Sequence, residues 1–101
     1  MFQLIYASTP ISGLTQTDAK QIAIRSRDKN RISGVTGVLL ISGSSILQVL
    51  EGEEMIVRRI YQLILRGHQH TRCELLLTRH CDARSFPHWT MGFCVVDNEA
   101  D

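Results

Sequence analysis

Residues 33–51, "SGVTGVLLISGSSILQVLE", decide the fold. Two apolar runs rich in β-branched residues, 35–41 and 46–50, stand on either side of "SGSS", which has the composition of a turn. The stretch therefore predicts a hairpin of two buried strands. Gln48 is the residue in it that needs explanation, because a buried carboxamide without a partner costs about 1–3 kcal/mol.

The flanking segments complete the fold. Alternating residues at 2–8 predict a strand. A capping-box-like pair at Thr15 and Asp18 predicts the start of a helix over 15–31, and apolar residues that recur every three to four positions predict a second helix over 53–66. Further strands are predicted at 73–81 and 91–96. The order βαββαβ with an added strand predicts an α+β, ferredoxin-like sheet with two helices on one face.

Composition limits the possible functions. A chain of 101 residues is one domain, which we expect over residues 1–96, with a frayed acidic end at 97–101. The net charge of +1 is spread along the chain, so we expect neither nucleic acid nor a membrane as a partner. Three cysteines, no signal peptide and no long apolar run favour the cytoplasm.

Two polar side chains share the face of the sheet that should lie beneath the helices. Tyr6 lies on the strand face of Leu4 and Ser8, and Gln48 on that of its apolar neighbours. The phenol can donate to the carboxamide oxygen, which leaves the amide N–H groups in need of an acceptor. Asn30 lies on one face of the first helix with Ser26 and could offer a ligand both a donor and an acceptor.

Apolar residues of the two helices would form the walls around these polar groups. Ile22 of the first helix and Ile60 or Ile64 of the second suit an aromatic ring held between the helices. The residues therefore predict a slot for a flat heterocycle.

Each residue also has a simpler explanation. Tyr6 could be an ordinary core residue, and Gln48 could lie at an edge. Asn30 could cap the C-terminus of the first helix, and Trp89 and Met91 could fill the core beside the last strand. The combination and its spacing favour the slot.

The chain closely resembles the BLUF family of blue-light sensors from residue 4 to about residue 95. The matching motifs are "LIYAS", "SRDKNRISGVTGVLL", "LQVLEG" and "RSFPHWTMGF", in the same order and at similar separations. The resemblance implies a ferredoxin-like fold with FAD held between the two helices.

The resemblance also implies roles for individual residues. Tyr6 resembles the photoactive tyrosine, Gln48 the glutamine between tyrosine and flavin, and Asn30 the asparagine that pairs with the C4 carbonyl and N3 edge of the ring. Trp89 and Met91 resemble the pair that reports the light state, and we expect both beside Gln48. Further residues at positions that line the flavin pocket are Ser8, Ile22, Ser26, Arg27, Ile46, Ile64 and His70.

The implied activity is light-driven proton-coupled electron transfer between the flavin and Tyr6 through Gln48. Gln48 is left rotated or as a different tautomer, and no substrate turns over, so we expect a photoreceptor that is not an enzyme. The signal would pass to an effector protein or domain, and we expect a homo-oligomer. Residues 71–101 would form the transmitting surface.

The sequence departs from the family pattern in one segment. Leu63, Gly67 and Gln69 replace an arginine, an aspartate and a second arginine that are usual on the ribityl and phosphate side of the cofactor. FMN or riboflavin therefore remain alternatives to FAD. Arg66 and Arg27 are candidates to supply the missing contact to phosphate.

Other functions remain open. A ferredoxin-like interaction module that has lost its flavin is one alternative. A metal-binding domain is another, although the spacing of its candidate ligands fits no common zinc site and we expect no metal. These ligands are His68, His70, Cys73, His80 and Cys81. A hydrolase of the acylphosphatase type is disfavoured because no glycine-rich anion loop is apparent.

Overall fold

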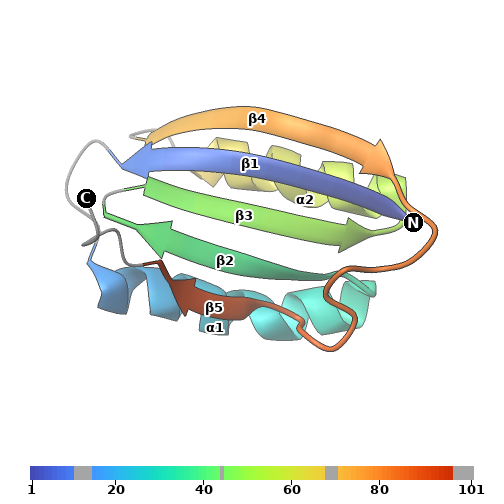
Figure 1. Cartoon of the computed structure of the whole chain (residues 1–101), viewed down its shortest axis with the longest axis horizontal. Coiled ribbons are helices and arrows are strands. Elements are labelled where there is room, and N and C mark those ends of the chain that lie inside the picture. Colours follow the sequence, from blue (N-terminus) through green and yellow to red (C-terminus); the bar gives the residue numbers. More distant parts are fainter. Residues whose placement is uncertain (11–14, 44, 68–70, 97–101) are drawn as a thin grey trace.

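The computed structural model describes residues 1–10, 15–43, 45–67 and 71–96. In these ranges, five strands form one sheet in the order β4-β1-β3-β2-β5, and two helices lie on one face of it (Figure 1). The pairing is antiparallel except for β2 with β5, which is parallel. The elements are β1 (Phe2–Pro10), α1 (Gln16–Ser33), β2 (Thr36–Ser42), β3 (Ser45–Gly52), α2 (Glu54–Gly67), β4 (Thr71–His80) and β5 (Gly92–Val95). The predicted ferredoxin-like fold is confirmed.

Helix α1 has clear signals at both ends. The Asp18 amide donates to Oγ1 of Thr15 over 3.1 Å, and the Thr15 amide donates to the Asp18 carboxylate over 3.2 Å, which forms the predicted capping box. The helix ends at Gly34, whose φ of 72° is the left-handed conformation that glycine adopts without strain. The explanation of Asn30 as a C-cap is therefore wrong, because the helix continues past it to Ser33.

The helices cover different parts of the sheet. Helix α1 contacts β2 and β5, whereas α2 contacts β1 and β3 (Figure 1). Ala19 and Ala23 are fully buried on α1, and small side chains at this spacing let the helix approach the sheet closely. Leu4, Leu39 and Leu50 fill the core beneath the helices. Because the helices lie over different strands, a space remains between them.

The segment between β4 and β5 is anchored on the sheet. The Arg84 guanidinium donates to Oγ1 of Thr36 over 2.8 Å and to the carbonyl oxygens of Gly34 and Glu51 over 2.7 and 3.0 Å. The amide of Gly37 donates to the carbonyl oxygen of Trp89 over 2.8 Å. Both ends of the loop that leads into β5 are thus fixed to the backbone of neighbouring elements.

Several expectations lie partly outside the described residues. These include the frayed end at 97–101 and the pocket or metal role of His70, together with Gln69 and His68. In the described residues, no group of three His, Cys, Asp or Glu side chains comes together as a metal site. Neither of the two helices is long and apolar enough to span a membrane.

Candidate functional site

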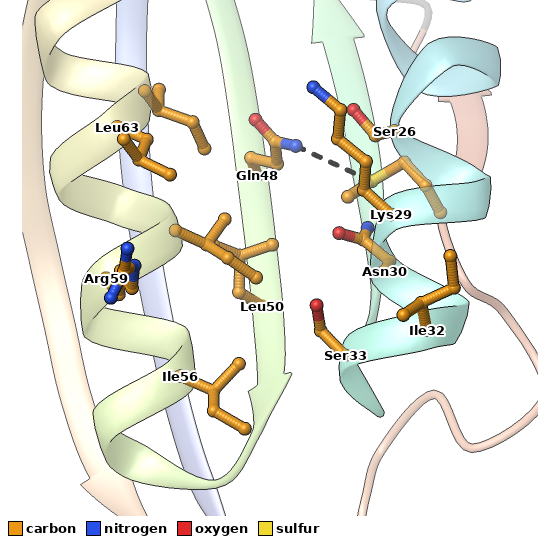
Figure 2. Close-up of a pocket in the computed structure, with 13 residues that line it drawn as sticks. Ser26, Lys29, Asn30, Ile32, Ser33, Gln48, Leu50, Ile56, Arg59 and Leu63 are labelled. Atoms are coloured by element: carbon orange, nitrogen blue, oxygen red, sulfur yellow. Dashed lines mark hydrogen bonds between the residues drawn. The ribbon is translucent and has the colours of Figure 1, made fainter.

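A cavity of about 640 Å³ opens between α1 and α2. Its floor is formed by Gln48 and Leu50 of β3, and its walls are formed by the two helices (Figure 2). Helix α2 contributes mainly apolar side chains, whereas α1 contributes mainly polar ones. The helix residues that line it are Ser26, Lys29, Asn30, Ile32, Ser33, Ile56, Arg59, Ile60, Leu63 and Ile64.

Tyr6 and Gln48 lie together beneath this cavity. They are direct partners in the antiparallel ladder of β1 and β3, and the Tyr6 hydroxyl donates a hydrogen bond to Oε1 of Gln48. Both side chains are buried. Burial raises the pKa of the Tyr6 phenol well above its ordinary value, and nearby Cys73 and Tyr61 raise it further. Tyr6 therefore keeps its proton and remains a donor.

The amide nitrogen of Gln48 has a weak partner. It donates to the sulfur of Met91 over 3.6 Å, and a thioether is a poor acceptor (Figure 2). Met91 is 1% exposed, so water does not compete for the contact. A buried carboxamide in this state can exchange its sulfur partner for a better acceptor in the cavity.

Asn30 presents an acceptor to the same space. Its side-chain nitrogen donates to the carbonyl oxygen of Thr90 over 2.6 Å, and its side-chain oxygen points into the cavity (Figure 2). The contact also explains the burial of Asn30, because the loop before β5 packs over it. The cavity thus offers a ligand an N–H donor from β3 and a carbonyl acceptor from α1.

A second cavity of about 50 Å³ adjoins the first, since both are lined by Ser26, Gln48 and Ile64. Ser26 spends its own hydroxyl on the Ile22 carbonyl oxygen, at 2.9 Å. Tyr6 also lines this cavity, together with the predicted pocket residues Ser8, Ile22 and Ile46. The structure therefore brings most of the predicted site residues together.

Arg27 and Trp89 lie elsewhere. Arg27 donates to the carbonyl oxygen of Met91 over 3.1 Å and lines a surface hollow with Trp89, and neither residue lines either cavity. Trp89 is 51% exposed and stacks on Phe86, with ring centroids 5.8 Å apart. The expectation that both Trp89 and Met91 lie beside Gln48 is wrong for Trp89. The explanation of Trp89 as a core residue is also wrong.

Sequence reasoning missed three charged residues. Lys29 and Arg59 line the cavity, and Glu51 is fully buried, where its carboxylate accepts hydrogen bonds from the amides of Ser85 and Phe86, each at 2.8 Å. The position of Lys29 beside Asn30 and the helical spacing of Arg59 from Leu63 were available signals. The partners of Glu51 are more than 30 residues away, and no local pattern indicates them.

Comparisons with known proteins identify the family of the chain. Residues 1–92 match the model of the BLUF family, "Sensors of blue-light using FAD". A blue light- and temperature-regulated antirepressor of Escherichia coli (strain K12) is 39% identical over 67 residues, which are 66% of this chain and 16% of that protein.

Solved structures agree as well. A bacterial light-regulated adenylyl cyclase superposes with a TM-score of 0.85 at 32% identity, over 93% of this chain and 28% of that one. The ground state of BlsA superposes with a TM-score of 0.85 at 30% identity, over 94% of this chain and 64% of that one. The chain therefore spans only a small part of the antirepressor and of the cyclase. It belongs to the BLUF family, the sensors of blue light that use FAD.

Proposed function

We propose that this chain is a blue-light photoreceptor unit in which Tyr6 and Gln48 form the switch. The observation that carries the proposal is the buried hydrogen bond from Tyr6 to Gln48 at the floor of the cavity. Both members of the pair are oriented by their strands, and the amide of Gln48 still lacks a strong acceptor.

The residues fit a flavin ring. Ile60 and Ile64 supply a flat apolar wall, Gln48 supplies a donor for a ring carbonyl, and Asn30 supplies an acceptor for a ring N–H. We assign ring binding to these residues and to the predicted pocket residues of the adjoining cavity. Arg27 would act through the backbone of Met91, which it holds, and His70 stays a prediction.

A flavin held by these residues would supply the absorption of blue light and the electron acceptor. Tyr6 is the donor that the site offers, and its Oη proton can pass directly to Oε1 of Gln48 along their hydrogen bond. Gln48 would at the same time pass a proton from Nε2 to the ring that has taken the electron, because a carboxamide both accepts and donates. When the electron and a proton return to Tyr6, Gln48 can be left with its carboxamide rotated or as its other tautomer.

The change at Gln48 would next affect Met91, whose sulfur accepts from its amide. A reoriented amide no longer directs Nε2 at the Met91 sulfur, so the residue before β5 loses a contact. Trp89, on the same loop, is already outside the core and could replace it. This route would carry the signal from β3 to the loop and then to the last strand of the sheet.

The output is proposed from the relatives. Their names describe an antirepressor and photoactivated or light-regulated adenylate cyclases, so light controls more than one kind of output among them. We propose that this chain likewise performs no catalysis of its own and signals to an effector protein or domain. We also propose a homo-oligomer, and a cytoplasmic location in which thiols such as Cys81 and Cys94 stay reduced.

An absorption spectrum before and after blue illumination tests the function. We expect a yellow protein whose flavin band shifts reversibly to the red. A colourless protein that no flavin can reconstitute would contradict the proposal and favour an interaction module without a chromophore.

A further inference from the structure

The cavity between the helices carries charge of one sign. Lys29 of α1 and Arg59 of α2 both line it, and none of the described residues that line it is an aspartate or a glutamate. Both cations are exposed, so they lie where the cavity meets solvent. A cavity with this lining favours an anionic ligand.

Neither cation is used elsewhere in the described part of the chain. Arg31 pairs with Asp28 over 3.2 Å, and Arg58 pairs with Glu54 over 2.8 Å. In contrast, no ion pair or hydrogen bond joins the side chain of Lys29 or Arg59 to another described residue. Two cations that line one cavity and have no charged partner among the described residues would both attract an anion that enters it.

The two cations come from the two helices that enclose the proposed ring site. Lys29 adjoins Asn30 on α1, Arg59 stands on the facing helix, and Leu50 forms the floor between them (Figure 2). A ring held by Gln48 and Asn30 at the buried floor would leave its ribityl chain to run toward solvent, where these two exposed side chains lie. The first group with negative charge along that chain is a phosphate.

We infer that Lys29 and Arg59 bind the phosphate shared by FMN and FAD, the one attached to the ribityl chain. This inference rests on the proposed function, because it places a flavin in this cavity. It assigns the phosphate contact to a pair of cations on facing helices. Arg66 and Arg27, the candidates suggested by sequence, do not line the cavity.

Flavin affinities test the assignment. The full chain, freed of flavin, is titrated with riboflavin, FMN and FAD, and each Kd is measured by fluorescence quenching. We expect FMN and FAD to bind about tenfold more tightly than riboflavin, and added salt to reduce this difference. Lys29→Gln and Arg59→Gln should each raise the Kd for FMN and for FAD about threefold to tenfold. The Kd for riboflavin should rise by less than about twofold.

Matched controls remove the same charge from the same helices. Lys20→Gln on α1 and Arg66→Gln on α2 alter exposed cations that do not line the cavity, so all three affinities should stay unchanged. Equal affinity for the three flavins would overturn the inference while leaving the photoreceptor intact. A loss caused by Arg66→Gln and not by Arg59→Gln would also overturn it. Failure to bind any flavin, riboflavin included, would refute the proposed function and the inference together.

Discussion

The hydroxyl of Tyr6 donates to Oε1 of Gln48, its direct partner across the ladder of β1 and β3. The donor is held in its neutral form by burial, and the acceptor is held in place by Tyr6 on one side and Met91 on the other. The arrangement makes the carboxamide the part of the site most easily changed, since one of its two partners is weak.

Gln48→Leu should keep the flavin and abolish the light-induced shift. Leucine is close in size to glutamine but can neither accept the proton of Tyr6 nor donate to the ring, whereas the apolar walls and Asn30 remain. The measurement is the difference spectrum after blue illumination. Gln62→Leu changes an exposed glutamine of α2 and is the matched control. A normal photocycle in Gln48→Leu would show that the switch is misassigned.

Tyr6→Phe should also abolish the shift while flavin stays bound, because the phenyl ring has neither a hydroxyl proton nor the same ease of oxidation. Tyr61→Phe is the control, since its ring lies 5.2 Å from that of Tyr6 but makes no hydrogen bond to Gln48. Transient absorption after a light pulse distinguishes the two variants. If only Tyr61→Phe loses the photocycle, Tyr61 and not Tyr6 is the electron donor.

The raised pKa of Tyr6 predicts a dependence of stability on alkaline pH. In the unfolded chain a tyrosine ionises near pH 10, whereas the folded state keeps Tyr6 protonated to higher pH. The contribution of Tyr6 to stability is therefore complete below pH 10. Above pH 10 the free energy of unfolding should fall by up to about 1.4 kcal/mol per pH unit.

Urea unfolding of the flavin-free protein at a series of pH values from 8 to 11.5 measures this slope. Tyr6→Phe should lower the free energy of unfolding by about 1 kcal/mol at pH 8, because Oε1 of Gln48 loses its partner. It should also show a shallower decline above pH 10 than the unchanged protein. Parallel declines would show that Tyr6 ionises normally in the fold.

Glu51→Gln should destabilise the protein by about 1–3 kcal/mol. Both carboxylate oxygens of Glu51 are in use: one accepts from Phe86, and the other accepts from Ser85 and from the side chain of Gln3 over 2.8 Å. Glutamine would replace one of these acceptors with a donor and leave a buried amide unpaired.

Chemical denaturation measures the effect, with Glu74→Gln, an exposed glutamate of β4, as the control. We also expect the Glu51 variant to recover from illumination at a different rate, because the loop that carries Met91 is less firmly held. Equal stability of the two variants would argue against a role for Glu51 in anchoring the loop.

The strands, and the face of α1 that carries Ser26 and Asn30, could be predicted because both depend on local periodicity. Alternation along β1 and β3 predicts the shared face of Tyr6 and Gln48, and a spacing of four predicts that of Ser26 and Asn30. The loop before β5 was less predictable. Its path depends on Arg84, Glu51 and other contacts between distant segments, and so Trp89 was wrongly expected beside Gln48.

The register of β1 and β3 has a consequence for how such a protein can vary. Ile5 pairs with Val49 and Ala7 with Leu47, and these residues point away from the helices because successive side chains of a strand alternate. Even-numbered positions of the two strands therefore face the helices and the proposed switch, and odd-numbered positions lie on the opposite face, where Gln3 and Glu51 are covered by the loop before β5. Apart from Gln3 and Glu51, which hold the loop before β5, odd-numbered residues such as Ile5 and Leu47 can be substituted while Tyr6 and Gln48 stay in place, so a lineage can alter what this face contacts and still keep the switch.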